Sequence, residues 1–278
     1  MKVIVSHLSP DIDSITAVWL IKRFLPGWID AELRFVPAGA TLDNKPADEN
    51  PKIIHVDTGL GKFDHHQNSD YICAASLVFD YLKSQGYLKD KQKRALDKMV
   101  REITGFDHFG EVFFPESFAD RYEFMLQKII EGGLKSVLKE DINVVEAVFP
   151  MLDSILNIFI KKNQAEEEIK KGFVFASFVG RSLCMETRNE ETIKLALKLG
   201  YKLVVKKDPE RGNVRIKTLP GKKYDLSPVY IKILKADKKG TWFLHVSHNM
   251  LLNSSSKNPN FVPSPLTVKK LIEIVKSV

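Results

Sequence analysis

Short apolar runs alternate with helical patterns in the first part of the chain. Residues 3–5 are a β-branched run, and 33–36 and 53–56 are short, mostly apolar runs, bounded by polar residues, Gly or Pro. Between the first two runs, apolar residues at 17–24 recur at helical spacing behind Ser14. Strands separated by a helix are typical of a parallel sheet, so the pattern predicts an α/β fold here.

The middle of the chain is predicted to be helical, and the end to be mixed. Apolar residues at three-and-four spacing occur in segments 74–85, 91–104, 118–138 and 142–162. A final helix is expected after Pro265, a further helix at 190–199, and strands at 173–179, 202–206, 214–218 and 242–246. Segment 161–171 is almost wholly charged or amide, which indicates a linker. We therefore expect an α/β parallel-sheet domain with a helical middle segment over residues 1–160, and a smaller α+β domain over 172–278.

Composition narrows the class of protein. The chain has 278 residues, of which 44% are hydrophobic and 28% charged, and no apolar run approaches the roughly 18 residues of a membrane span. The apolar run at the start is shorter than a signal-peptide core, so we expect a cytoplasmic protein without a membrane partner. Cys73 and Cys184 are the only cysteines, which excludes a disulfide framework. The net charge of +7 would attract an anionic substrate, although lysines on solvated helices produce the same excess.

Histidine and aspartate are concentrated at the ends of the predicted strands. Five of the seven histidines precede residue 110, and four clusters combine them with aspartates: His7, Asp11 and Asp13; Asp57; Asp64, His65 and His66; and Asp107 and His108. The carboxyl edge of a parallel sheet is where such loops meet and where ligands bind. The pattern therefore predicts one site assembled from four segments.

The donor types indicate a metal site. A carboxylate such as Asp57 can bridge two cations roughly 3.5 to 4 Å apart, which activate water and neutralise charge on phosphorus oxygens. Mixed imidazole and carboxylate donors favour transition metals over Mg²⁺. We expect two divalent ions, with Mn²⁺ as the preferred metal and Mg²⁺ or Co²⁺ as alternatives. Two structural alternatives stand beside this interpretation: Asp11 and Asp13 could cap the following helix, and His55 could be a hydrogen-bonded core residue.

Four motifs in order resemble those of the DHH phosphoesterase superfamily. They are HLSPDIDSI, VDTG, FDHHQ and GFDHFG, within about the first 110 residues, and ASLVFDYL looks like the helix that follows the third. The superfamily includes RecJ-like nucleases, nanoRNA and cyclic dinucleotide phosphodiesterases, exopolyphosphatases and family II inorganic pyrophosphatases. The resemblance implies one ion held by His7, Asp11 and Asp57, and a second held by Asp13, Asp57, His65 and Asp107. It also implies that His66 contacts the scissile phosphate and that Asp64 orients neighbouring histidines.

Other candidate substrate contacts lie outside these motifs. His108 has no clear counterpart in the superfamily and could be an extra substrate contact or a structural residue. The carboxyl-terminal part lacks the Gly-Gly-Gly-His type loop of many relatives and is loosely similar to the melanocyte-proliferation-gene branch, whose members resemble RNA exonucleases. Its segment HVSHNMLLNSSSKNP contains candidate phosphate ligands, namely His248, Ser254, Ser255, Ser256 and Lys257. The alternative is that this segment is a polar surface loop. Arg181, in FVGRS after a strand, could clamp a phosphate or form a surface ion pair.

Three functions follow as hypotheses. The first is a metal-dependent phosphodiesterase or exonuclease acting on a short RNA or DNA oligonucleotide or a nucleotide. The second is hydrolysis of a phosphoanhydride, as by a pyrophosphatase or exopolyphosphatase. Family II pyrophosphatases usually carry a Ser-Arg-Lys signature, of which only Ser256 and Lys257 are present here, and the missing Arg counts against this hypothesis. The third is a non-catalytic nucleotide or RNA binder, which predicts lost metal ligands, whereas every ligand position is filled here.

Overall fold

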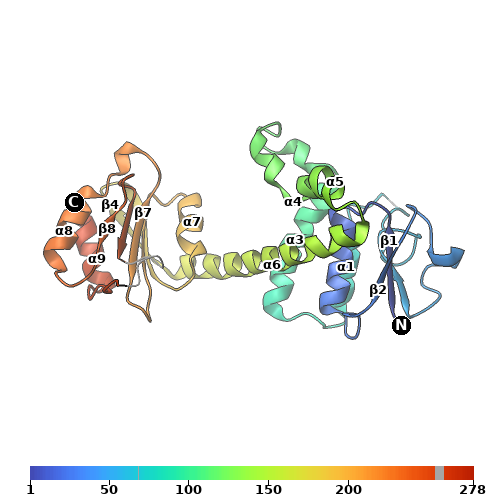
Figure 1. The fold of residues 1–278 in the computed structure, drawn as a ribbon. Helices are drawn as coiled ribbons and strands as arrows, with labels where there is room; N and C mark the ends of the chain where they lie inside the picture. Colours follow the sequence, from blue (N-terminus) through green and yellow to red (C-terminus); the bar gives the residue numbers. More distant parts are fainter. Residues whose placement is uncertain (68, 254–259) are drawn as a thin grey trace. The chain divides into compact units, whose positions relative to one another are not determined.

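The computed structural model describes residues 1–67, 69–253 and 260–278. The chain divides into two compact units, Met1–Ile160 and Lys161–Val278, each with its own hydrophobic core. Helix α6 (Asp141–Lys171) contains the boundary between them (Figure 1). Segment 161–171, expected to be a linker, is therefore the last part of a helix, and it lies in the second unit.

A three-stranded parallel sheet organises the first unit. Its strands are β1 (Val3–His7), β2 (Glu32–Val36) and β3 (Ile53–His55), in the order β2-β1-β3. β1 pairs in parallel with both neighbours, which confirms the predicted α/β fold class. Because the strands are parallel, the residues that follow β1 and β3 emerge at the same edge of the sheet.

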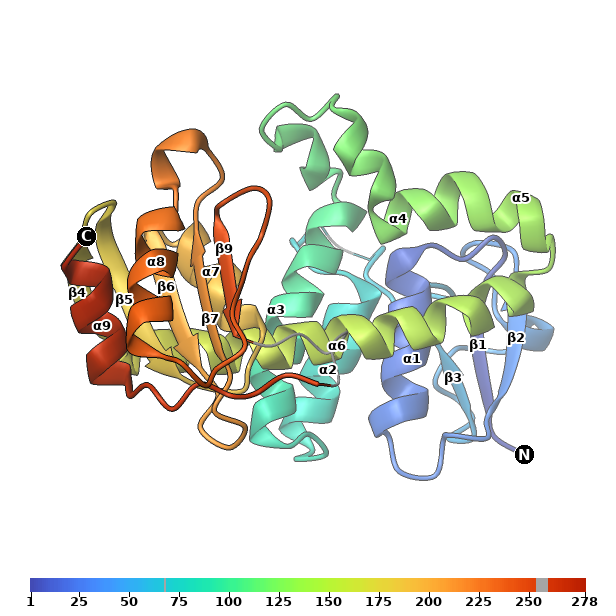
Figure 2. The ribbon, with the colours of Figure 1, turned by 60° about the vertical axis from the view of Figure 1, so that its left-hand side comes forward.

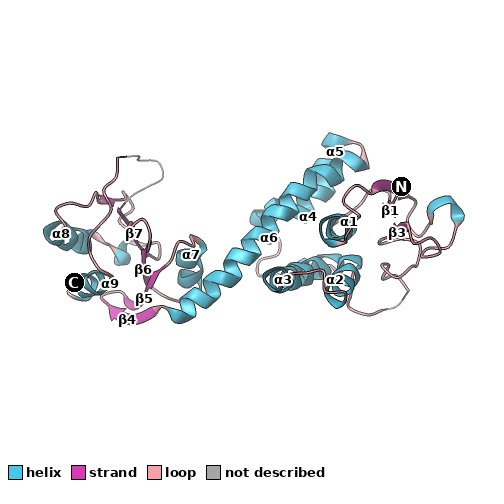
Figure 3. Cartoon of the chain, turned by 90° about the horizontal axis from the view of Figure 1, so that it is seen from below, coloured by secondary structure: helices cyan, strands magenta, loops and turns pink. Residues whose placement is uncertain are grey.

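Three helices lie together beside this sheet (Figure 3): α1 (Ile12–Phe24), α2 (Ala74–Ser84) and α3 (Asp90–Asp107). Their apolar faces share one core, to which Ile4, Trp19, Leu82 and Leu96 contribute fully buried side chains. Helices were predicted at 74–85 and 91–104, and the structure confirms both, extending the second to Asp107. That extension places a predicted metal ligand at the end of a helix.

Segment 118–138, predicted to be helical, is helical over most of its length but is not one regular α-helix. This stretch contains a 3-10 turn (Asp120–Phe124), α4 (Leu126–Lys128), a π-helical turn (Ile129–Leu134) and α5 (Lys135–Leu138). Gly132 and Gly133 fall in the middle of it, and glycine is a poor residue for continuing an α-helix. Other 3-10 turns lie at Leu42–Asn44, Gly110–Phe113 and Lys222–Tyr224.

Helix α6 contributes to the core of the first unit. Val144, Val148 and Leu152 on this helix are buried there, while Pro150 lies inside the helix. By length and composition alone α6 is apolar enough to cross a membrane, with 28% of its most apolar window buried, which is weak evidence for a span. The absence of a membrane partner stays a prediction.

The second unit is built on a six-stranded mixed sheet in the order β4-β5-β6-β7-β9-β8. Its strands are β4 (Phe173–Ser177), β5 (Gly180–Glu186), β6 (Leu203–Lys207), β7 (Val214–Thr218), β8 (Phe243–Leu244) and β9 (Met250–Asn253). Helices α8 (Ser227–Ala236) and α9 (Val268–Lys276) cover one face, and α7 (Glu191–Lys198) covers the other (Figure 2). This arrangement confirms the predicted α+β character. The strand expected over 242–246 is shorter, and β5, β9 and α8 were not predicted.

Candidate metal centre

The predicted ligands meet at the carboxyl edge of the parallel sheet. His7 is the last residue of β1, and Asp57 follows β3 by two residues. Asp11 is the N-cap of α1, and Asp107 is the last residue of α3. The ends of these four elements thus lie at one place, although β3 and α3 are far from β1 and α1 in the sequence, as the strand-end pattern predicts.

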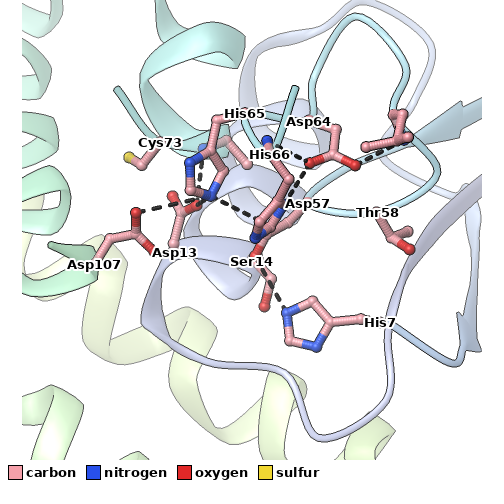
Figure 4. Close-up of polar contacts among 12 residues, drawn as sticks. His7, Asp13, Ser14, Asp57, Thr58, Asp64, His65, His66, Cys73 and Asp107 are labelled. Atoms are coloured by element: carbon pink, nitrogen blue, oxygen red, sulfur yellow. Dashed lines mark hydrogen bonds and ion pairs between the residues drawn. The ribbon is translucent and has the colours of Figure 1, made fainter. Parts of the chain in front are cut away.

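Asp57 lies between two imidazoles (Figure 4). Its Oδ2 is 3.2 Å from His7 Nε2, and its Oδ1 is 3.3 Å from His65 Nε2. The residue is buried and its backbone is left-handed, with φ of 55°, a conformation that Asp adopts more readily than most residues. The two oxygens of one carboxylate therefore face different nitrogen donors, which is the geometry expected of a bridging ligand.

His65 connects the remaining carboxylates. Its Nε2 is 3.7 Å from Asp107 Oδ2 and 3.9 Å from Asp13 Oδ2. Potential ligand atoms form three overlapping groups, in each of which all atoms lie within 4.8 Å of one another: His7, Asp11 and Asp57; Asp57, His65 and His66; and His65, Asp107 and His108. All six residues predicted as metal ligands are thus gathered around Asp57 and His65.

Asp11 and Asp13 also bind helix termini. Asp11 Oδ1 accepts a hydrogen bond of 2.9 Å from Ser14 N, so the capping alternative describes Asp11 correctly. Asp13 is fully buried and accepts 2.8 Å hydrogen bonds from Ala74 N and Ala75 N, so it caps α2 instead of its own helix. Burial, together with the charges of Asp57 and Asp11, raises the pKa of Asp13. A cation beside Asp13 would offset this electrostatic cost.

Asp64 fixes the second histidine of the DHH sequence. The buried Asp64 carboxylate lies 2.6 Å from His66 Nδ1 through Oδ1, and accepts a 2.7 Å hydrogen bond from Leu60 N through Oδ2. The His66 side chain is 59% exposed. A ring that is anchored on one side and open to solvent on the other can present Nε2 to a substrate, so the predicted roles of Asp64 and His66 are geometrically possible.

The charges of the centre are strongly coupled. Burial lowers the pKa of His7, but its hydrogen bonds to Asp57 and to the Leu8 carbonyl oxygen, together with the charges of Asp11 and Asp57, outweigh this and raise the pKa to about 9. The contact with Asp57 likewise raises the pKa of His65 to about 9, against the effect of burial and with help from Asp107. Burial would raise the pKa of Asp57, yet the two imidazoles hold it well below its usual range. Without a metal, protons on two histidines therefore balance the carboxylates.

Two buried atoms indicate that the centre fits a cation. Asp57 Oδ1 and His65 Nε2 are both buried and, apart from their 3.3 Å ion-pair contact with each other, make no hydrogen bond among the described residues. Leaving such groups unsatisfied costs about 1–3 kcal/mol each. A divalent ion accepts electron pairs from imidazole nitrogen and carboxylate oxygen together, so it would satisfy both atoms. The donor set thus fits transition-metal ions, and the ligand roles stay predictions.

Other predicted site residues make contacts of their own. His108 donates from Nε2 to the Ile72 carbonyl oxygen at 2.9 Å. His55 is buried, its Nε2 accepts a 3.0 Å hydrogen bond from Leu42 N, and burial lowers its pKa, as the structural alternative for this residue expects. The neutral form of His55 is therefore the one that its hydrogen bond requires.

The second unit contains the remaining candidates. Arg181 follows β4, as expected, but is itself the second residue of β5; its guanidinium lies 4.5 Å from the centroid of the Tyr201 ring. His248 Nδ1 is 3.0 Å from Ser227 Oγ and 3.2 Å from Asp225 Oδ1. Ser254, Ser255, Ser256 and Lys257 lie outside the described residues. Substrate contact by any of these residues stays a prediction.

Two residues near the centre were not predicted to belong to it. Cys73 Sγ lies 3.2 Å from Thr104 Oγ1, and burial raises the pKa of this thiol, so it remains a neutral thiol. Tyr71 stacks on His108 with 4.5 Å between the ring centroids. Nothing in the periodicity marks Tyr71, because it belongs to an irregular loop and meets His108 only through the fold.

No family model and no curated protein matches the chain. Several solved structures, including the three that follow, are similar to it at low sequence identity. A pGpG-specific phosphodiesterase from Vibrio cholerae has 15% identity and a TM-score of 0.35, over 90% of this chain and 91% of its own. RecJ from Thermus thermophilus, in complex with Mg²⁺, has 12% identity and a TM-score of 0.35, over 99% of this chain and 49% of its own. The DHH domain of a member of the s1p family of ribosomal proteins has 12% identity and a TM-score of 0.32, over 99% and 86%.

RecJ and the DHH domain belong to the superfamily that the sequence motifs resemble. Because the identities and TM-scores are this low, the geometry around Asp57 is the stronger guide to chemistry.

Proposed function

We propose that the chain is a DHH-type, metal-dependent phosphoesterase that hydrolyses phosphodiester bonds in short oligonucleotides. The observation that carries this proposal is the position of Asp57, whose two carboxylate oxygens lie 3.2 and 3.3 Å from the imidazoles of His7 and His65. One carboxylate between two groups of donors suits two cations that share it, and a pair of metals is typical of phosphoryl hydrolysis.

The remaining ligands complete two shells. His7, Asp11 and Asp57 would hold one ion, and Asp13, Asp57, His65 and Asp107 would hold the other. When bound, the ions would supply an activated water and neutralise charge on the phosphorus oxygens. Mn²⁺ is the preferred ion because the donors mix imidazole with carboxylate, with Mg²⁺ or Co²⁺ as alternatives.

The chain's own groups would orient the substrate. His66, which is anchored by Asp64 and half open to solvent, would donate a hydrogen bond to a non-bridging phosphate oxygen. His108 lies at the rim of the same centre. In the second unit, Arg181, His248 and the segment 254–257 are further candidate phosphate contacts. We place the reaction in the cytoplasm, consistent with two free, buried cysteines.

One experiment separates the three functional hypotheses. Purified protein with Mn²⁺ is given a labelled short RNA, the corresponding DNA, and inorganic pyrophosphate, and the products are separated. We expect mononucleotides from at least one oligonucleotide, and none from the Asp57→Asn variant. Asp90→Asn is the matched control, because it makes the same chemical change at a carboxylate that is 99% exposed.

Each other outcome identifies an alternative. Release of phosphate from pyrophosphate alone would make the chain a phosphoanhydride hydrolase. Binding of two Mn²⁺ ions, counted by electron paramagnetic resonance, without turnover of any of the three substrates would contradict the proposed activity and favour a nucleotide-binding protein.

A further inference from the structure

An exposed aromatic ring is fixed at the rim of the metal centre. Tyr71 lies in the loop before α2, and its side chain is 66% exposed. Its ring lies 4.5 Å from that of His108, with 33° between the two planes. His108 is held in turn by its hydrogen bond to the Ile72 carbonyl oxygen, and it follows the candidate ligand Asp107 directly. The Tyr71 ring is thus in contact with His108, while much of its surface stays exposed to solvent.

Tyr71 also forms part of the wall of a cavity. This cavity has a volume of about 440 Å³ and is lined by residues of α2 and α3, with Ile72 beside Tyr71. Sites for small molecules are typically about 300–1,000 Å³. Thr104, the lining residue nearest to the end of α3, precedes Asp107 by three residues, which is about 4.5 Å along a helix axis. The cavity therefore begins within one helical turn of the metal centre.

The charges of the cavity distinguish between ligand types. Its lining includes the carboxylates of Asp80 and Asp97 but a single cation, Arg101, which is already paired with Asp97. Two carboxylates against one guanidinium disfavour a second phosphate group. Phe79 and Val100 supply apolar surface in the same cavity. Apolar walls with an aromatic ring and a few polar groups suit a flat, uncharged heterocycle whose edges carry hydrogen-bond donors and acceptors.

We propose that this cavity is a nucleobase subsite, in which Tyr71 stacks on the base of a nucleotide whose phosphate lies at the metal centre. The inference rests on the proposed function and specifies its substrate class. The preferred substrate carries a base next to the reacting phosphate, so an inorganic pyrophosphate or polyphosphate leaves the subsite empty.

The kinetic test compares two substrates and three variants. The substrates are a 5′-phosphorylated dinucleotide and the same molecule with abasic sugars. Tyr71→Leu removes the ring and keeps apolar bulk, Tyr71→Phe keeps the ring, and Phe118→Leu is the control at a phenyl group that is 90% exposed. Because stacking on an aromatic side chain is worth about 1–3 kcal/mol per base, we expect Tyr71→Leu to raise KM for the dinucleotide roughly 5- to 150-fold. In Tyr71→Leu, KM for the abasic substrate should stay within about twofold of the wild-type value. In Tyr71→Phe and in Phe118→Leu, KM for each of the two substrates should also stay within about twofold of wild type.

A binding test separates this inference from the proposed activity. A dinucleotide containing 2-aminopurine, whose fluorescence is quenched by stacking, is titrated into Asp57→Asn and into Asp57→Asn combined with Tyr71→Leu. Quenching that depends on Tyr71 supports the subsite even if the wild-type protein hydrolyses none of the substrates, in which case only the proposed activity fails. The opposite result is that the wild-type protein cleaves the 5′-phosphorylated dinucleotide and its abasic analogue, while Tyr71→Leu changes neither KM for the dinucleotide nor the quenching of 2-aminopurine. That result would overturn the subsite and leave the proposed activity standing.

Discussion

Asp64 illustrates how one buried carboxylate can control a histidine that faces solvent. Its two oxygens contact His66 Nδ1 and Leu60 N, and it belongs to none of the three overlapping ligand groups. Its function would then be to fix the tautomer of His66, with the proton on Nδ1 shared with the carboxylate.

Replacing Asp64 should therefore reduce turnover without removing metal. We expect Asp64→Asn to lower kcat about 10- to 100-fold, the usual effect of losing a residue that orients a functional histidine. Mn²⁺ stoichiometry measured by electron paramagnetic resonance should remain two. A drop to one ion or none would show instead that Asp64 supports the metal ligands themselves.

Proton competition at His7 and His65 predicts a pH dependence of metal binding. Both imidazoles have a pKa of about 9 in the metal-free structure, so they are protonated at pH 7 and must lose those protons to become ligands. Metal affinity should therefore rise with pH, about tenfold per pH unit for each imidazole, and level off above pH 9. Calorimetric titration of Mn²⁺ at pH 6.5, 7.5 and 8.5 in two buffers would measure the released protons. An affinity independent of pH over this range would contradict the assignment of these histidines as ligands.

At the scale of elements, Asp237 closes the connection from α8 to β8. Its Oδ1 accepts hydrogen bonds from Lys239 N and Gly240 N at 3.0 and 2.7 Å, and its Oδ2 accepts from Trp242 Nε1 and Ser264 Oγ at 2.8 and 2.7 Å. Burial alone would raise the pKa of this carboxyl, but these four donors lower it. The charged form thus holds together the loop after α8, Trp242 just before β8, and the segment before α9.

Asp237→Asn should destabilise the second unit by about 2–3 kcal/mol at pH 7, because the buried donors lose a charged acceptor. Since the folded pKa is below the unfolded value of about 3.9, the stabilisation is present above that value and is lost as pH falls through the folded pKa. The free energy of unfolding of Asp237→Asn and of wild type is measured in urea at pH 7 and pH 3. The difference between the two proteins should be smaller at pH 3. Glu273→Gln, in an exposed pair with Lys270, is the control and should change stability by less than about 1 kcal/mol. An equal loss at both pH values would mean that the charge of Asp237 is irrelevant.

The sequence predicted the elements whose signal is local. The strands and first helices of the first unit follow from apolar periodicity, and the strand-end clusters predicted the metal centre because parallel strands end at one edge. β9 was missed because its four residues form a strand mainly by pairing with β7, more than 30 residues earlier, and pair with only two residues of the nearby β8. Tyr71 was missed for the same reason, since its partner His108 lies 37 positions away. Non-local contacts leave no periodic pattern to detect.

At the scale of the whole molecule, two units with separate cores hold different parts of the candidate machinery. Every residue of the three overlapping ligand groups belongs to Met1–Ile160. The network around Asp237 belongs to Lys161–Val278. Metal should therefore stabilise one unit and leave the other nearly unchanged.

Calorimetric melting can distinguish the two units if each is changed separately, the first by Mn²⁺ binding and the second by Asp237→Asn. Mn²⁺ at about 100 times its Kd contributes about 2.7 kcal/mol for each ion bound, so each of the two proposed ions should raise Tm by about 5–10 °C for a unit of this size. We expect that rise in one transition only, and its loss on addition of a chelator or in the Asp57→Asn variant. Asp237→Asn should lower the other transition and leave the Mn²⁺ shift intact. If both transitions move together under either perturbation, the units unfold as one cooperative body, and α6, which contains the boundary, is the element that would couple them.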